Sequence, residues 1–189
     1  MEQLLKNIAQ CRVCEEFLPL EPRPVVQASP TSKILIIGQA PGTKVHESGI
    51  PWDDPSGDRL RSWMNISKEI FYDPSVIALV PMGFCYPGKG KSGDLPPRPE
   101  CAPLWHQLLL DSMPEIRLTL LFGTYAQSYY LKDRMKNTLS ETVKSFREYL
   151  PEYLPMPHPS PRNNIWLKKN PWFEEEVIPW LRRSISSSL

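Results

Sequence analysis

Four short apolar segments constrain the fold of this chain more than any other feature. They are Ser32–Ile37, Ser75–Val80, Leu118–Phe122 and Tyr153–Met156, and the first and third run directly into Gly38 and Gly123. An apolar run of this length that ends at a turn residue is typical of a parallel strand covered on both faces. Patterns typical of helices lie between and around these runs, at residues 2–10, 56–70, 101–110 and 124–131, more weakly at 142–150, and from 170 onward.

This alternation predicts an α/β fold, in which a central four-stranded parallel sheet lies between two layers of helices (α/β/α). At the last helix, Asn170 fits the N-cap and Pro171 the first turn, and three glutamates follow at the positive end of the helix dipole. The chain has 189 residues and no internal repeat, so we expect one domain over residues 1–189. The 22 prolines predict many fixed turns and long ordered loops.

Charge and hydropathy bear on the cellular location and the partners of the protein. The net charge is +1, so any nucleic-acid binding must come from local clusters of charge. No apolar run reaches the length of a membrane-spanning helix, and the first eleven residues form an amphipathic pattern unlike a signal peptide. We therefore expect a cytoplasmic, monomeric protein without membrane contact, whose four cysteines do not form disulfides.

One histidine and one serine lie among three prolines in the segment Pro157–Asn163, which reads PHPSPRN. Proline fixes its own φ and favours extended backbone in the residue before it, so His158 and Ser160 sit in a stiffened loop. A stiff loop that presents two polar side chains suits a functional site. The alternative is a proline-rich connector in which the histidine is incidental.

Three loops are expected to meet at one edge of the sheet, because ligands of parallel sheets bind beyond the carboxyl ends of the strands. These are the loop that starts at Gly38, the loop after Val80 and the His158 loop. The first reads Gly38-Gln39-Ala40-Pro41-Gly42, and its two glycines allow the backbone to approach a ligand closely. The alternative for this segment is an ordinary strand-to-helix turn.

The four cysteines form a C-x-x-C pair, Cys11 and Cys14, and a second pair, Cys85 and Cys101, with fifteen residues between its members. Such a set in a cytosolic protein indicates a four-thiolate metal site, and both a [4Fe–4S] cluster and a structural zinc fit it. The alternative is four small buried residues. The loop between Cys85 and Cys101 carries Lys89, Lys91 and Arg98, which a bound metal would present to phosphate, unless they are simply a solvated basic loop.

The order of these motifs resembles the uracil-DNA glycosylase superfamily. The order is C-x-x-C, a strand, G-Q-A-P-G, then G-x-P-W ending at Trp52, the second cysteine pair, and H-P-S after the last strand. It is most similar to the iron–sulfur branch (family 4), while the tail H-P-S-P-R-N is similar to the loop of the single-strand-selective branch. The resemblance covers about residues 11–165.

The resemblance implies a DNA N-glycosylase of base excision repair, which hydrolyses the bond between a deaminated or damaged base and its sugar. His158 would stabilise the departing base, and Gln39 would contact water or the base. Trp52 would stack on the flipped base, unless it is a core aromatic. Ser160 would hold a phosphate, and Arg162, with Pro161, would enter the gap left in the DNA. The implied cofactor is a [4Fe–4S] cluster, with zinc as the alternative, and the implied partner is DNA, single-stranded or with a flipped base.

Two departures from the family pattern bear on the substrate. Gln39 and Ala40 stand where the family carries carboxylates, so a carboxylate that orients water must come from elsewhere, with Glu47, Asp53 and Asp54 nearby in sequence. Pro81 stands where the family reads uracil with an asparagine, and Asn163, on another loop, is a possible substitute. A site without its polar reader should be less selective or should read another base.

Two other classes of function compete with this one. The first is a nucleic-acid-binding member of the same fold with weak or no catalysis, which the changes at Gln39 and Pro81 favour. The second is a metal-stabilised redox or sensor protein, for which the four cysteines are the main support.

Overall fold

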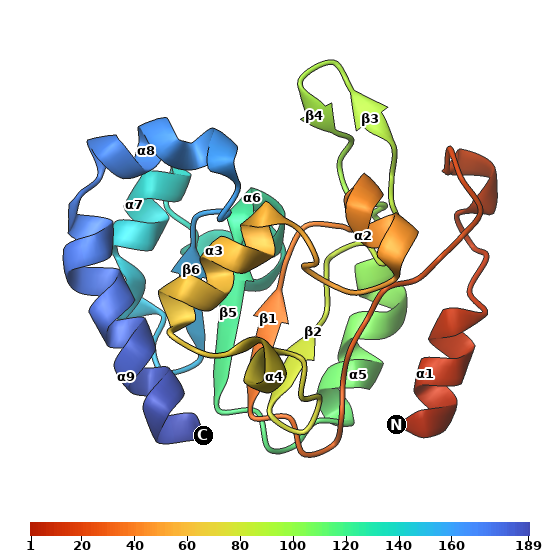
Figure 1. Cartoon of the computed structure of the whole chain (residues 1–189), viewed down its shortest axis with the longest axis horizontal. Helices are drawn as coiled ribbons and strands as arrows, with labels where there is room; N and C mark the ends of the chain where they lie inside the picture. Colours follow the sequence, from red (N-terminus) through yellow and green to blue (C-terminus); the bar gives the residue numbers. More distant parts are fainter.

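The computed structural model describes all residues, 1–189, and has a four-stranded parallel sheet at its centre (Figure 1). The strands are β1 (Ile34–Ile37), β2 (Ile77–Leu79), β5 (Leu118–Phe122) and β6 (Tyr153–Met156). Their order in the sheet is β2-β1-β5-β6, and every neighbouring pair is parallel. The predicted α/β/α fold with four parallel strands is confirmed. The third and fourth strands have the predicted bounds, and the first two are shorter at their ends.

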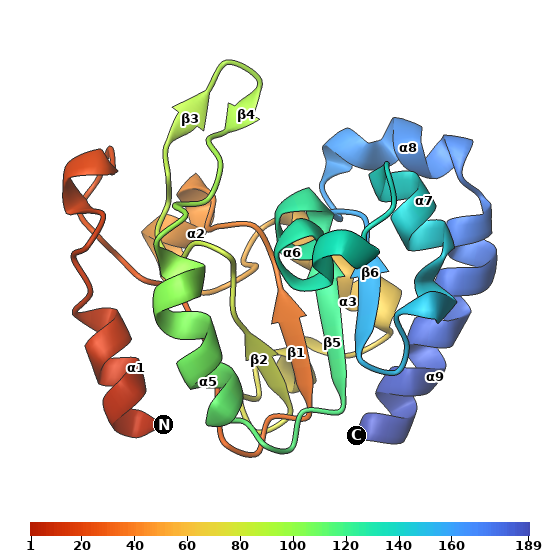
Figure 2. The ribbon, with the colours of Figure 1, turned by 180° about the vertical axis from the view of Figure 1, so that it is seen from behind.

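The helices lie on both faces of this sheet (Figures 1 and 2). They are α1 (Glu2–Ala9), α2 (Thr43–Ser48), α3 (Pro55–Met64), α4 (Lys68–Phe71), α5 (Gln107–Asp111), α6 (Gly123–Leu131), α7 (Leu139–Lys144), α8 (Asn164–Lys169) and α9 (Ile178–Ser188). A π-helical turn leads into α5 at Ala102–His106 and another into α9 at Phe173–Val177. No helix is both long enough and apolar enough to cross a bilayer.

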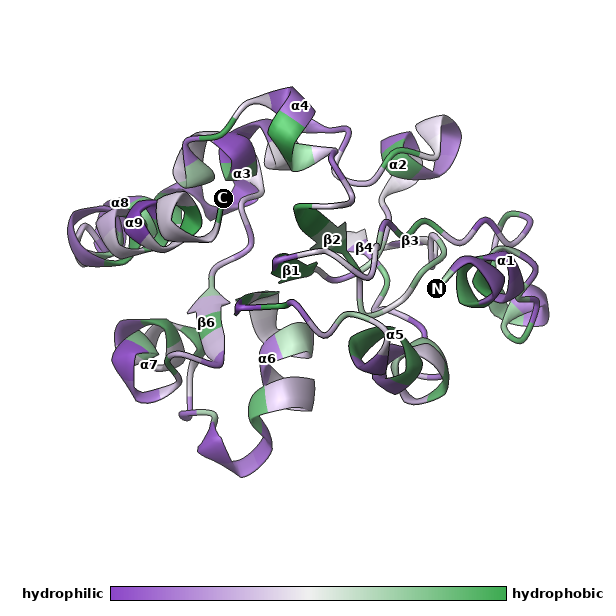
Figure 3. Ribbon diagram, turned by 90° about the horizontal axis from the view of Figure 1, so that it is seen from below, coloured by the Kyte–Doolittle hydropathy of each residue, from purple (hydrophilic) through white to green (hydrophobic).

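The strands bury both of their faces, and alternate residues feed two separate cores. Ile34 and Ile36 of β1 pack with residues of α3, α4 and α9 on one side of the sheet, whereas Leu35 and Ile37 pack with α1, α5 and α6 on the other. Figure 3 shows the apolar strands between these layers. Because successive side chains of a strand point to opposite faces, a strand inside a sandwich must be apolar throughout, as these segments are.

Several predicted helix bounds were wrong. The segment 56–70 is two helices, because Asn65 adopts φ 55°, a left-handed conformation that ends α3. The helix expected over 142–150 begins earlier, at Leu139, where Thr138 and Glu141 form a reciprocal capping box. The side chain of Asn170 does not cap the last helix; it donates to the carbonyl of Trp166 and accepts from the indole of Trp172.

Three elements were not predicted: α2, α8, and a hairpin formed by β3 (Lys89–Gly90) and β4 (Gly93–Asp94). The hairpin stands out beyond the carboxyl ends of the central strands (Figures 1 and 2). Each of these elements is only two to six residues long, too short to show the apolar periodicity that signals a helix or strand. Two of them, α2 and the hairpin, nevertheless border the candidate site, through Val45, Gly93 and Asp94.

Candidate active site

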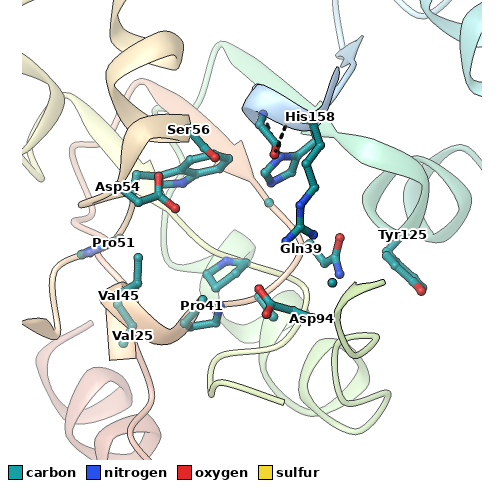
Figure 4. A pocket seen from close by; sticks show the side chains of 18 of the residues that line it. Val25, Gln39, Pro41, Val45, Pro51, Asp54, Ser56, Asp94, Tyr125 and His158 are labelled. Atoms are coloured by element: carbon teal, nitrogen blue, oxygen red, sulfur yellow. Dashed lines mark hydrogen bonds between the residues drawn. The ribbon is translucent and has the colours of Figure 1, made fainter. Parts of the chain in front are cut away.

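A cavity of about 530 Å³ opens at the carboxyl edge of the sheet (Figure 4). All ten non-cysteine residues predicted for the site line it: Gly38, Gln39, Ala40, Pro41, Gly42, Trp52, His158, Ser160, Arg162 and Asn163. The three predicted loops therefore meet in one place. Other lining residues come from segments that the sequence did not associate with the site, including Ser92–Asp94 of the hairpin and Tyr125 of α6.

His158 is held in a single protonation state by its own loop. The backbone N–H of Ser160 donates to Nδ1 of His158 over 3.2 Å, so Nδ1 must keep its lone pair. Burial lowers the pKa of His158 below its ordinary value, and the charge of Asp54 only partly opposes this. The imidazole is therefore neutral, with its proton on Nε2, and can donate one hydrogen bond into the cavity.

Side chains from neighbouring segments fix the backbone of the His158 loop. Asn163 donates from Nδ2 to the His158 carbonyl over 2.7 Å. Arg59 of α3 donates to the Ser160 carbonyl over 3.1 Å and to Oδ1 of Asn164 over 2.7 Å. The buried amide of Gln127 donates to the Met156 carbonyl, over 2.9 Å, just before the loop begins. Arg59 and Gln127 were missed in the sequence, because nothing in their local pattern indicates a contact so distant in the chain.

Trp52 forms one wall of the cavity and also packs on the core. Its ring stacks on the ring of His158, with centroids 5.6 Å apart and planes at 25°, and meets Phe122 edge-on at 5.7 Å. Trp52 adopts φ 58°, an unusual conformation for a bulky residue. A Cβ at Gly38 would lie 2.8 Å from Cζ2 of Trp52, so the glycine is needed for the ring to lie there.

Two carboxylates enter the cavity, from segments other than the Gln39 loop. Asp54 is the N-cap of α3, and its Oδ1 accepts from the Gly57 N–H over 2.8 Å, which leaves the second oxygen free. Asp94, on the exposed hairpin, lines the opposite part of the cavity near Pro41 (Figure 4). Of the three carboxylates near in sequence, Asp54 alone lines the cavity; Asp53 lies 3.8 Å from Lys68, and Glu47 is exposed on α2.

Pro81 lines the cavity but offers no hydrogen-bonding side chain. Its carbonyl is also engaged, because Nε2 of the buried His106 lies 3.0 Å from it. Nδ1 of His106 lies 2.6 Å from the hydroxyl of Tyr130, so the tyrosine donates to Nδ1 while Nε2–H donates to Pro81. The Pro81 carbonyl is thus bound to a buried side chain and is not free to contact a ligand.

The buried His106 should make stability depend on pH. Burial lowers its pKa from 6.5 to about 4, so below pH 6.5 the unfolded chain takes up a proton that the folded protein does not. The contribution of His106 is complete above pH 6.5 and is lost as the pH falls from 6.5 toward 4. Urea unfolding at a series of pH values should show a decrease of a few kcal/mol, at about 1.4 kcal/mol per pKa unit. The decrease should be smaller in His106→Gln; an equal decrease would contradict this assignment.

All four cysteines border a second, much smaller cavity, which shares no lining residue with the large one. None is in a disulfide. Burial raises the pKa of Cys14, Cys85 and Cys101 to about 11 each, so the thiols without a bound metal are protonated at neutral pH. No three His, Cys, Asp or Glu side chains are gathered closely enough to hold a single metal ion.

A buried donor without a partner also faces this region. The indole Nε1 of Trp105 is buried and forms no hydrogen bond, and Trp105 lines the same small cavity as the cysteines. A buried N–H rarely remains without an acceptor. Four thiols and one unpaired N–H around one cavity suit a metal group that thiolates ligate and that has an atom able to accept a hydrogen bond.

A comparison with protein families identifies the superfamily of this chain. The model of the Uracil DNA glycosylase superfamily matches residues 25–182, which is most of the chain. The chain therefore belongs to the uracil-DNA glycosylase superfamily, whose members are usually DNA glycosylases, hydrolases that act on DNA. The match includes every residue that lines the large cavity, but it begins after Cys11 and Cys14.

Proposed function

We propose that this protein is a DNA glycosylase that removes uracil, or another deaminated or damaged base, from DNA. The observation that carries the proposal is the neutral His158, which presents Nε2–H to a cavity walled by Trp52. A cavity of about 530 Å³ has room for one nucleotide that has left its stack. The partner is DNA, with the target base unpaired or flipped, and we expect the protein to act as a monomer.

The proposed reaction breaks the bond between C1′ of the sugar and the nitrogen of the base. The bonding electrons leave with the base, whose oxygen becomes negative and accepts a hydrogen bond from His158 Nε2–H. Water adds its hydroxyl to C1′, and its proton completes the free base. Trp52 stacks on the flipped base, and the amide of Gln39 faces the same space. Ser160 holds a flanking phosphate, and Arg162 enters the gap that the flipped base leaves in the DNA.

Asp54 is our candidate for the carboxylate that orients water and stabilises the positive sugar. Its orientation is fixed by the hydrogen bond from Gly57, whereas Asp94 lies on an exposed hairpin without an ion pair. We expect Asp54→Asn to lower kcat about 10²-fold, the lower range for a missing acid–base group. Asp94→Asn, the matched variant on the other side of the cavity, should change kcat much less. If Asp94→Asn lowers kcat more than Asp54→Asn does, the role belongs to Asp94.

The direct test uses oligonucleotides that contain uracil, hypoxanthine, xanthine or an oxidised pyrimidine, in single and double strands. After incubation with the protein, hot alkali cleaves the strand at each abasic site, and a gel separates the products. We expect cleavage with at least one of these bases. No cleavage with any of them, in either form of DNA, would contradict the enzymatic proposal.

A second candidate function is binding to nucleic acid without catalysis. Pro81 favours it, because neither its side chain nor its engaged carbonyl can read a base edge. Such a protein would bind damaged DNA without releasing a base, and His158→Ala would leave its affinity unchanged. The glycosylase proposal also predicts that His158→Ala keeps binding, but it predicts in addition that the parent protein releases a base and that this variant does not.

We further propose that Cys11, Cys14, Cys85 and Cys101 hold a [4Fe–4S] cluster. A single zinc, with Zn–S bonds of about 2.3 Å, needs sulfurs less than about 4 Å apart, whereas a cluster holds its ligands around a larger body. The proposal is supported by the position of all four cysteines around one cavity and by the unpaired N–H of Trp105 beside it, which a bound sulfur could accept. When bound, it would cross-link the N-terminal segment to the loop that carries the hairpin.

Anaerobically purified protein should be brown, with broad absorbance in the visible range and about four irons per chain. Changing Cys85 or Cys101 to serine should remove the colour and the iron. A colourless protein with one zinc per chain would establish the alternative metal. Reversible bleaching on reduction would show in addition that the cluster is redox-active, as a redox or sensor role requires.

A further inference from the structure

Tyr125 is an aromatic side chain at the margin of the large cavity that has no partner in the protein. It lies in the first turn of α6, just after β5 ends, and is 40% exposed. Its hydroxyl forms no hydrogen bond, and no other aromatic ring packs on it; the one side-chain hydrogen bond at this residue runs from Ser128 to its backbone carbonyl. Figure 4 shows Tyr125 at the edge of the cavity and turned away from His158. The proposed reaction at His158 makes no use of it.

A second exposed tyrosine follows one helical turn later. Tyr129 is 38% exposed, and its position four residues after Tyr125 places both side chains on one face of α6, with Cβ atoms about 5–6 Å apart. Unlike Tyr125, Tyr129 packs on other aromatic rings of the protein. Its ring meets that of Tyr130 edge-on, with centroids 5.2 Å apart, and that of His106 at 6.1 Å. The two rings thus form a short exposed row that leads away from the cavity.

The helix that carries this row is uncharged. The sequence of α6, GTYAQSYYL, contains no charged residue, so no carboxylate of this helix repels a phosphate backbone. At its C-terminal end the exposed Lys132 is balanced by the exposed Asp133, and Arg134 pairs with Glu152. The positive charge near the cavity that could attract phosphate is the exposed Arg162, at another margin. A strand whose target base enters the cavity would carry its neighbouring nucleotides past this margin.

We propose that Tyr125 and Tyr129 form a stacking platform for the unpaired bases that flank the target nucleotide in single-stranded DNA. This inference rests on the proposed function, since it assumes that the cavity receives a base of DNA. Every base has a π face, so such stacking tolerates any sequence. Bases of a duplex are already stacked and paired, so they cannot occupy the platform without melting. The platform therefore gives the protein a preference for single strands.

The test measures binding rather than cleavage, so it stands apart from the test of the glycosylase. The probe is a fluorescent oligothymidylate without a damaged base, and its affinity is measured by fluorescence anisotropy, beside a duplex of the same length. We expect Tyr125→Ala and Tyr129→Ala each to weaken single-strand binding about 5-fold or more, on the scale of base–aromatic stacking, with little change for the duplex. Tyr125→Phe and Tyr129→Phe keep the ring and should bind as the parent protein does.

Leu108→Ala is the matched control, because it removes a side chain of similar exposure, 49%, from another helix. Thermal unfolding of each variant checks that the fold is retained. Unchanged single-strand affinity in both folded alanine variants would overturn the platform, as would an equal loss for duplex and single strand. If no base is ever released but the alanine variants lose single-strand binding, the platform stands and the glycosylase proposal fails alone.

Discussion

Replacing His158 with alanine should lower the rate of base release about 10²–10³-fold, the cost of removing one preorganised donor from a site of developing negative charge. The effect should fall on kcat, because the bond from Nε2–H strengthens as charge moves onto the departing base. The measurement is single-turnover cleavage of the best substrate found in the panel. Affinity for uncleaved DNA should change little, because this donor faces the base and not the phosphates.

The dependence of the rate of base release on pH tests the role of His158 in a second, independent way. Its pKa lies below the ordinary histidine value of 6.5 because the ring is buried, so the neutral form persists at mildly acidic pH. Base release should therefore continue below pH 6.5 and fall only when the ring takes up a proton and loses the bond from Ser160 N–H to Nδ1. His46→Ala removes an imidazole from outside the cavity lining and should leave both rate and profile unchanged. A His158→Ala variant with the parent rate would contradict the assigned role.

The central sheet was predictable because a parallel strand that is buried on both faces must consist of apolar residues. The run Leu118–Phe122 shows this most directly, since all five residues are buried in the structure. The hairpin of β3 and β4 was not predictable in the same way. Its four paired residues, Lys89-Gly90 and Gly93-Asp94, are polar or lack a side chain, so their place depends on contacts with distant segments. A Cβ at Gly93, for example, would collide with Arg162.

The candidate site was predictable to the extent that its residues lie on loops that follow strands. Parallel strands present their carboxyl ends at one edge of a sheet, and this rule alone is enough to bring Gln39 and His158 together. The rule does not say which side chains complete the cavity from outside those loops. Asp94 arrives from the hairpin and Tyr125 from the first turn of a helix, and neither position has a signal in the local sequence.

Replacing Gly57 with alanine should be among the most damaging single substitutions outside the catalytic loop. Gly57 lies in the first turn of α3, and a Cβ there would overlap the backbone carbonyl of Trp52. Backbone cannot yield as a flexible side chain can, so either the start of α3 or Trp52 must move. Trp52 already adopts φ 58°, and the rings of His158 and Trp52 stack on each other, so the displacement reaches the centre of the site.

We expect Gly57→Ala to lower the free energy of unfolding by about 3 kcal/mol, the upper range for inserting an extra methyl group into packed structure. Base release should fall at least tenfold even at temperatures where the variant is folded, because the wall of the cavity has moved. Gly90→Ala is the matched control, since the nearest atom to its Cβ would belong to the flexible side chain of Leu95, at 3.3 Å. Urea unfolding and single-turnover cleavage give the two readouts. A Gly57→Ala protein with parental stability and rate would show that Trp52 can leave its observed position freely, and the stacking role assigned to it would then be wrong.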